Sequence, residues 1–206
     1  AERYVHILTI EDPIEYKFEE QRAIISQRQI GIDVPSYSLA MKSALREDPD
    51  VILMGEMRDA ESIDIALTAA ETGHLVLSTL HAPNSADAIN RIVSTFEGAE
   101  QKTIRTKLAQ NLRSIVTQKL LPRLSGTGRA VACEVLQISA FARDLIIDPE
   151  RIQDLKDLIK SGDQGSGNLY FDDYLEHLVR EEIISHEVAL DNASSVTDLA
   201  LKLKGF

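Results

Sequence analysis

The chain has 206 residues, of which 44% are hydrophobic and 27% charged, and its formal charge at pH 7 is −11. Because this composition can bury an apolar core, global disorder is excluded, and the acidic balance disfavours a nucleic-acid-binding protein. The single cysteine, Cys133, rules out an intramolecular disulfide and a four-cysteine zinc site, and it favours a reducing, cytosolic compartment. No apolar run reaches the roughly 18 residues of a membrane span.

Short apolar runs alternate with amphipathic segments through the first part of the chain. Buried strands are predicted at residues 5–10, 51–54 and 75–80, and an edge strand or hairpin arm at residues 23–26. Helices are predicted between and after these runs, at residues 37–46, 60–72 and 84–93. This succession predicts a parallel α/β sheet that helices cover on both faces.

The second part of the chain is mostly helical in pattern. Apolar residues at helical spacing predict one long helix over residues 104–120, and residues 129–138 are strand-like. Only the helical period follows, interrupted by a flexible connector at residues 161–168. Residues 148–206 hold 13 acidic and 6 basic side chains, against 20 and 16 in residues 1–147. We therefore place a boundary after residue 147, between an α/β body and an acidic helical end.

Polar side chains lie at the ends of three predicted strands. Glu11, Asp12 and Glu15 follow the first strand, Glu56, Arg58 and Asp59 follow the second, and Thr79 and His81 end the third, with His74 near its start. The carboxyl ends of parallel strands meet at one edge of a sheet, where ligands bind. Carboxylates orient water or hold the water shell of Mg²⁺, while arginine and histidine stabilise charge on phosphoryl oxygens. Together these groups predict a site for Mg²⁺ and a polyphosphate.

Each of these features also has a plainer interpretation when it is taken alone. Residues 11–15 fit a solvated turn with a proline stop, and His74 beside Gly73 fits a cation at the C-terminus of a helix. An acid after four aliphatic residues, as at Glu56, often occurs by chance. The three features in this order are harder to attribute to chance.

Three segments resemble motifs of the secretion and type IV pilus ATPase superfamily. Residues 9–15 (TIEDPIE) resemble its aspartate box, residues 45–59 (LREDPDVILMGEMRD) its Walker B signature, and residues 72–82 (TGHLVLSTLHA) its histidine box. Within the superfamily, the chain is most similar to the PilT-like retraction ATPases, and the resemblance extends to residues 181–206. Extension and type II secretion relatives usually carry a four-cysteine zinc motif, which a chain with one cysteine cannot form.

The resemblance implies a RecA-like P-loop NTPase core over residues 1–147, incomplete here, and a small helical C-terminal subdomain over residues 148–206. It implies ATP and Mg²⁺ as cofactors, with Glu56 as the Walker B glutamate near Mg²⁺. Glu15 would be the second catalytic carboxylate, and either glutamate could be the general base. The remaining site residues would be Glu11 and Asp12 in the aspartate box, and His74, His81 and Arg58 near the γ-phosphate.

The resemblance also implies partners and a location. The full-length family member would be a homo-hexameric motor of pilus retraction and twitching motility, acting on the platform protein of the pilus. It would work in the cytoplasm, at the inner face of the inner membrane, without nucleic acid or zinc.

The phosphate-binding loop GxxxxGK[ST], whose backbone amides cradle phosphates, does not occur in these 206 residues. In the family it precedes the aspartate box, which begins here at residue 9. The resemblance therefore implies that the chain corresponds to the C-terminal part of the family, and we expect it not to turn over ATP alone.

Two other classes of function compete with this interpretation. The chain would be a non-catalytic interaction module, or a truncated paralogue, if it only assembles with a pilus or secretion ATPase. A DNA-translocating ATPase of related fold is disfavoured by the acidic balance.

Overall fold

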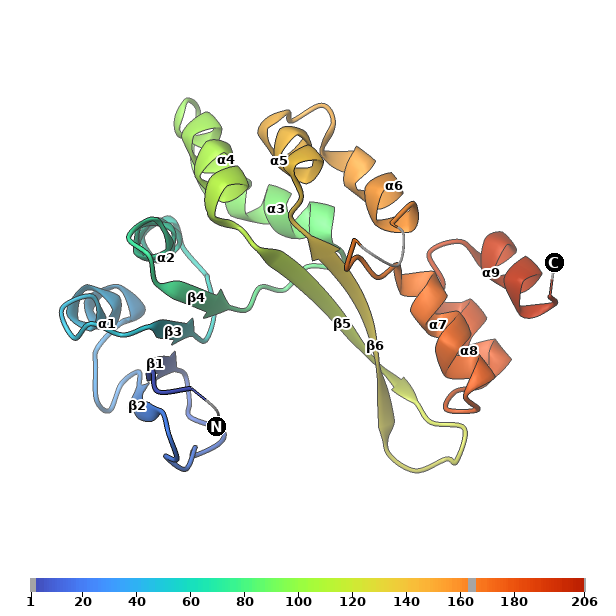
Figure 1. Cartoon of the computed structure of the whole chain (residues 1–206), viewed down its shortest axis with the longest axis horizontal. Coiled ribbons are helices and arrows are strands. Elements are labelled where there is room, and N and C mark those ends of the chain that lie inside the picture. The colour runs from blue at the N-terminus through green and yellow to red at the C-terminus, as the bar shows by residue number, and fades with distance from the viewer. Residues whose placement is uncertain (1–2, 163–165, 206) are drawn as a thin grey trace. The chain divides into compact units, whose positions relative to one another are not determined.

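The computed structural model describes residues 3–162 and 166–205, in two compact units (Figure 1). The first unit comprises residues 1–81 and 91–111, and the second comprises residues 82–90 and 112–206. Helix α3 (Ser85–Ser94) contributes to both. The boundary that charge suggested after residue 147 lies inside the second unit, so the compact units and the predicted domains divide the chain differently.

The first unit contains a parallel sheet, as predicted. Its strands are β1 (His6–Glu11), β2 (Ile24–Gln29), β3 (Val51–Met54) and β4 (Leu75–Ser78), in the order β2-β1-β3-β4. Because β2 runs parallel to β1, it is an edge strand and not a hairpin arm. The register pairs Ile10 with Met54 and Met54 with Ser78. The carboxyl ends of β1, β3 and β4 therefore reach the same edge.

Helices α1 (Tyr37–Ala44) and α2 (Ala60–Glu71) pack on one face of this sheet. The local sequence predicts Asp59 as the cap of α2 and either Ser36 or Ser38 as the cap of α1. Ser36 Oγ accepts from the Leu39 amide and Asp59 Oδ1 accepts from the Ser62 amide, so Ser36 is the cap of α1. Helix α4 (Glu100–Asn111) lies against α2. The core between sheet and helices consists of Leu8, Ile10, Ala40, Met41, Ala44, Ile52, Met54, Ala66 and Ala69.

The opposite face of the sheet differs from the prediction. Alternate residues of β4 point away from the helices, and Leu75 and Leu77 are 50% and 46% exposed. Among the described residues of this unit, the helices thus leave that face of β4 uncovered, although two-sided cover was predicted. The aliphatic run of β4 is typical of two-sided burial, but an apolar pattern does not specify which element provides the cover.

The second unit is built on an antiparallel ribbon of β5 (Ser114–Pro122) and β6 (Arg129–Gln137). The prediction of one helix over residues 104–120 is wrong in its second half, because α4 ends at Asn111 and the chain continues as β5. Strand β5 pairs with β6 along its whole length. Its residues Ile115, Val116 and Thr117 are β-branched, which favours a strand. Apolar spacing that fitted a helix is overridden here by strand pairing.

The remaining elements are helical, as predicted. They are α5 (Ala140–Ile147), η1 (Ile152–Asp154), α6 (Leu155–Lys160), α7 (Phe171–Arg180), α8 (His186–Asn192) and α9 (Val196–Leu203). The apolar faces of α7, α8 and α9 meet Leu121, Ala130 and Ala132 of the ribbon in one core. The predicted connector at residues 161–168 lies partly outside the described residues, at 163–165. Within the described ranges, no helix combines the length and apolar character needed to cross a bilayer.

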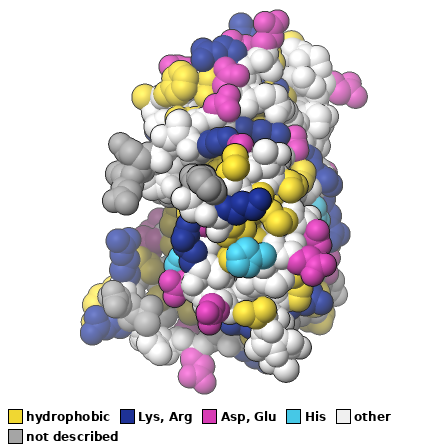
Figure 2. All heavy atoms as spheres, turned by 90° about the vertical axis from the view of Figure 1, so that its right-hand side faces the viewer, with side chains coloured by type: hydrophobic (Ala, Val, Ile, Leu, Met, Phe, Trp, Pro, Cys, Tyr) yellow, Lys and Arg dark blue, Asp and Glu magenta, His cyan; other side chains and the backbone are white. Residues whose placement is uncertain are grey.

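The acidic end carries compensating cations on its surface. Lys160 pairs with Asp198 at 2.8 Å, Arg180 pairs with a glutamate one turn away, and Lys202 pairs with Asp173. Figure 2 shows basic, acidic and hydrophobic side chains intermixed on the face that carries the C-terminal helices. Exposed pairs of this kind add little stability. These cations do offset part of the negative charge locally, and such a mixed surface is typical of a face exposed to solvent.

The one-sided core of the first unit predicts unequal effects of two truncations in neighbouring strands. In the 206-residue chain, Ile52→Ala should lower the free energy of unfolding by about 2–5 kcal/mol, because Ile52 is fully buried. The matched change Leu77→Ala should cost about 1 kcal/mol or less, because the side chain already meets solvent. Urea unfolding followed by circular dichroism measures both, and equal losses would contradict the proposed burial.

Candidate active site

The carboxyl ends of β1, β3 and β4 surround a cavity of about 430 Å³ within the first unit. Its polar lining consists of Glu11, Asp12, Glu15, Tyr37, Glu56, Arg58, Ser78 and Thr79. The sequence prediction that polar groups from three strand ends meet at one edge is therefore confirmed. Four carboxylates and one guanidinium face a single space. Such a lining is suited to holding water and an anion that carries a bound metal cation.

Hydrogen bonds tie the three strand ends together. The Gly55 amide donates to the Ile10 carbonyl at 2.8 Å, which joins the end of β3 to β1. Thr79 Oγ1 donates to the Gly55 carbonyl at 2.5 Å, and the Met57 amide donates to the Thr79 carbonyl at 3.2 Å. The loop that carries Glu56 is thus held from both sides.

Glu56 is the carboxylate with cationic neighbours. Arg58 Nε donates to Glu56 Oε2 at 2.7 Å, and His81 Nε2 lies 3.6 Å from Glu56 Oε1. The Glu56 side chain is 20% exposed, whereas those of Arg58 and His81 are 60% and 81% exposed. The hydrogen bond from Arg58 and the charge of Glu56 raise the pKa of Arg58. A partly buried carboxylate is therefore flanked by two solvent-facing groups that can bear positive charge.

Glu11 has a different role from the other carboxylates of the cavity. It is buried, and its Oε1 accepts hydrogen bonds from Thr9 Oγ1 at 2.5 Å and from Gln27 Nε2 at 3.0 Å. These bonds fix the end of β1 against β2. Glu11 is accordingly an anchor at the end of this strand.

The segment that presents Glu15 is anchored to β2 by two glutamines. Gln29 Oε1 accepts from the Ile14 amide at 3.3 Å, and Gln27 Nε2 also donates to the Tyr16 carbonyl at 2.9 Å. Asp12 and Glu15 both line the cavity. The sequence did not indicate these side-chain contacts of the glutamines, because they join residues nine or more positions apart.

His81 belongs to this edge of the sheet. It follows β4, and its carbonyl accepts from Arg91 Nη1 of α3 at 2.8 Å. This bond fixes the backbone at His81, and the His81 side chain lies near Glu56. His81 is therefore grouped with Glu56 and Arg58, as predicted.

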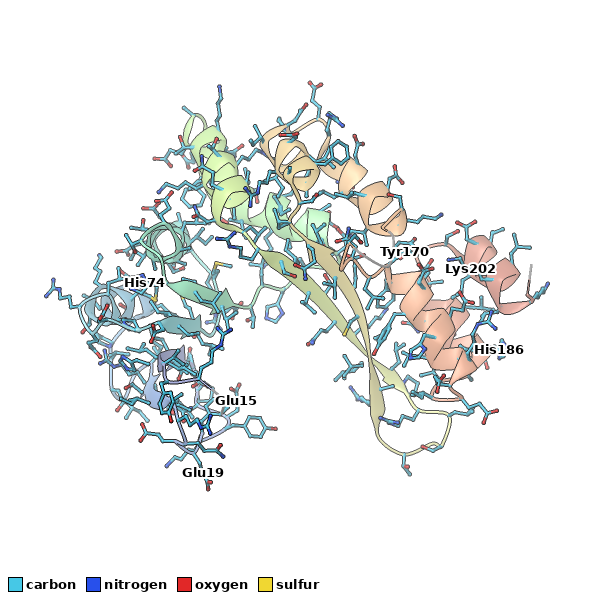
Figure 3. All side chains as sticks on the ribbon, viewed as in Figure 1. Glu15, Glu19, His74, Tyr170, His186 and Lys202 are labelled. Carbon is cyan, nitrogen blue, oxygen red and sulfur yellow. The ribbon has the colours of Figure 1, made fainter. Side chains whose placement is uncertain are left out.

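His74 does not join this group. It precedes β4, at the amino ends of the parallel strands, and Figure 3 shows it beside α2, whereas Glu15 follows β1. Its Nδ1 lies 2.9 Å from the Ala69 carbonyl and 3.1 Å from Thr72 Oγ1. The structure thus matches the plainer interpretation, in which His74 closes the end of α2.

Tyr37 is a residue of the cavity that sequence reasoning missed. The sequence marks it only as the start of a helix, but its side chain lines the space beside the carboxylates. Burial, and then the charge of Asp12, raise the pKa of the Tyr37 phenol. The signal in the sequence was a tyrosine at the first position of a helix that packs beside an acidic strand end.

The donors fit magnesium only in part. Oxygen ligands suit this ion, yet the described residues contain no group of three or more acidic, histidine or cysteine side chains placed to hold a metal. In nucleotide sites, Mg²⁺ is held by one or two carboxylates, phosphates and water. Glu56 therefore fits an indirect role, through the water shell of the ion.

Comparison with known proteins places the chain in a family. The family described as "Type II/IV secretion system protein" matches residues 1–167, which is most of the chain. The chain belongs to this family.

Two curated relatives show which secretion-family proteins it is similar to. It is 43% identical over 190 residues to a "Twitching motility protein" of Neisseria gonorrhoeae, which covers 92% of this chain and 50% of the relative. It is 42% identical over 191 residues to the type IV pilus retraction ATPase PilT of Pseudomonas aeruginosa, covering 93% and 55%. The chain therefore spans about half the length of the curated relatives it matches.

Solved structures support the same secretion-family fold. The crystal structure of the pilus retraction motor PilT with bound ADP matches with a TM-score of 0.86 and 39% identity. The match covers 97% of this chain and 56% of that protein. The predicted ATPase fold class, an α/β sheet flanked by helices with a helical end, is confirmed.

The close packing at Gly55 predicts a specific defect in this secretion-family chain. A Cβ at this position would lie 3.0 Å from the Tyr37 hydroxyl and 3.3 Å from the Ile10 carbonyl. Gly55→Ala should therefore lower the free energy of unfolding by about 1–3 kcal/mol, because neighbours must shift. Tyr37→Phe, which removes the nearer atom, should recover part of the loss in a double-mutant cycle measured by urea unfolding. Additive losses would contradict this contact.

Proposed function

We propose that this chain is the carboxylate-bearing part of an ATP-hydrolysing motor for type IV pilus retraction. The observation that carries the proposal is the cavity at three strand ends, in which Glu15 and Glu56 face one space. The names of two relatives, a twitching motility protein and a pilus retraction ATPase, agree with it.

The chemistry proposed for the cavity is hydrolysis of the terminal phosphoanhydride of ATP. A water oxygen forms a bond to the γ-phosphorus while the bond from that phosphorus to the bridging oxygen of ADP breaks. The proton of the water passes to a carboxylate oxygen of Glu56 or Glu15. When bound, Mg²⁺ would withdraw charge from the phosphoryl oxygens.

The cations beside Glu56 have a proposed role in the same reaction. Arg58 and His81 are solvent-facing, so each can turn toward a phosphate, where positive charge stabilises the transition state. Asp12 would help to hold the water shell of the ion, and Glu11 would act only through the position of β1. Phosphate sensing by His74 stays a prediction that its place at the other edge does not support.

The assembly and location are proposed on the resemblance. The parent protein would act as a homo-hexamer on the pilus platform protein, at the cytoplasmic face of the inner membrane, and would need neither nucleic acid nor zinc. The domains proposed for it remain a RecA-like core to residue 147 and a helical subdomain over residues 148–206.

We also propose that the 206-residue polypeptide is inactive alone, because it contains no GxxxxGK[ST] loop to hold the phosphates. The competing proposal is a non-catalytic module that assembles with a pilus or secretion ATPase. The two proposals differ in what happens when such a loop is supplied.

Carboxylate substitutions test the catalytic proposal. In a polypeptide that joins this chain to an upstream segment with the loop, magnesium-dependent ATP hydrolysis should appear, and Glu56→Gln should lower kcat at least about 100-fold. Glu15→Ala should also lower kcat strongly, since it removes the second carboxylate. Phosphate release measures both rates, and the isolated 206-residue chain is the control. Hydrolysis that survives both substitutions would remove the site assignment, and an inert wild type would favour the non-catalytic module.

Substitutions of the two histidines, His74 and His81, should have different effects on kcat and on thermal stability. His81→Ala should lower kcat about tenfold or more with little change in thermal stability, because its side chain is solvent-facing and lies beside Glu56. His74→Ala should lower the melting temperature and leave kcat within about twofold, because its ring closes α2. The opposite pattern would restore His74 as the phosphate sensor.

A further inference from the structure

Tyr37 places a hydroxyl group inside the carboxylate cavity. It is the first residue of α1, and its ring packs against the core between the sheet and the helices. The hydroxyl lies so close to β3 that an added Cβ on Gly55 would be 3.0 Å away. Packing of the ring therefore fixes the hydroxyl next to the loop that carries Glu56.

Two other hydrogen-bond donors of the lining are already engaged. Arg58 Nε donates to Glu56, and Thr79 Oγ1 donates to the Gly55 carbonyl. Ser78 Oγ also has no hydrogen-bond partner among the described residues, but it is buried and exposes almost no surface. In the described part of the chain, the Tyr37 hydroxyl has no hydrogen-bond partner, although it lines the cavity.

The surroundings of Tyr37 keep its proton in place. Its pKa is raised by burial first, then by the negative charge of Asp12, and also by Glu56 and Glu11; Arg58 opposes them. The phenol therefore remains a neutral donor near pH 7. A neutral donor among four carboxylates can meet a water oxygen without adding charge.

The geometry points to a role in orienting the reacting water. A water molecule held by carboxylates uses its two protons to donate to them, and its two lone pairs remain. We propose that the Tyr37 hydroxyl donates a hydrogen bond to one lone pair of this water, so that the other lone pair faces the phosphorus. This inference rests on the proposed hydrolysis and adds to it a residue that contacts the nucleophile.

The bond changes are those of hydrolysis itself. The free lone pair forms the new oxygen–phosphorus bond, the bond to the leaving ADP oxygen breaks, and a water proton passes to the carboxylate. Tyr37 keeps its own proton throughout, so no further reactant is needed. Its contribution is orientation, which acts on the chemical step and not on nucleotide binding.

The test is Tyr37→Phe in the active parent polypeptide that contains this chain. The substitution removes one oxygen and keeps the ring that packs against the core, so the fold should be retained. We expect kcat to fall about tenfold, while KM for ATP and the affinity for a fluorescent ADP analogue stay within about twofold. The control is Tyr4→Phe, the same change at a side chain that is 83% exposed and does not line the cavity, which should leave kcat unchanged.

Two results would overturn the inference while leaving the proposed function intact. One is a kcat for Tyr37→Phe within about twofold of the parent, and the other is an equal loss of kcat and ADP affinity, which would assign Tyr37 to nucleotide binding. Failure of the proposed function would show separately, as hydrolysis that Glu56→Gln does not reduce, and it would overturn both.

Discussion

The parallel register of β1, β3 and β4 is the constraint on which the candidate site depends. Pairing of Ile10 with Met54, and of Met54 with Ser78, brings three strand ends to one edge. The bonds from the Gly55 amide to Ile10 and from Thr79 to the Gly55 carbonyl then fix the loops that leave this edge. A shift of one residue in any pair would turn the polar groups to the other face of the sheet and disperse the cavity.

The carboxylates gathered by this register are not equivalent. Glu11 is buried and its Oε1 accepts hydrogen bonds from Thr9 and Gln27, so it stabilises the strand end. Glu56 instead pairs with Arg58 and lies near His81. Such differences in environment let a group of acids divide structural and chemical roles. The family and the crystal structure of PilT with ADP agree with a nucleotide site, and the proposed motor function builds on that agreement.

The sequence predictions failed where long-range contacts outweigh local pattern. Residues 112–120 have apolar spacing that fits a helix, yet pairing with β6 makes them a strand. The phosphate contact that the histidine box implies for His74 stays a prediction, and a four-residue strand separates His74 from the edge that holds His81. The sequence did not predict Tyr37 as a site residue, because a tyrosine at the start of a helix does not indicate a site until its neighbours are known.

The sequence by itself determined strands β1, β3 and β4, helices α1 and α2, the cap at Asp59, and the motifs that mark the family. These features depend on residues close together in the chain, such as an apolar run or a side chain three residues from the amide it caps. The tertiary structure alone decided that Glu11 is an anchor, that His74 lies apart from His81, and that the Tyr37 hydroxyl enters the cavity. Those outcomes depend on which strands pair and what packs beside them, and residues distant in the chain set both.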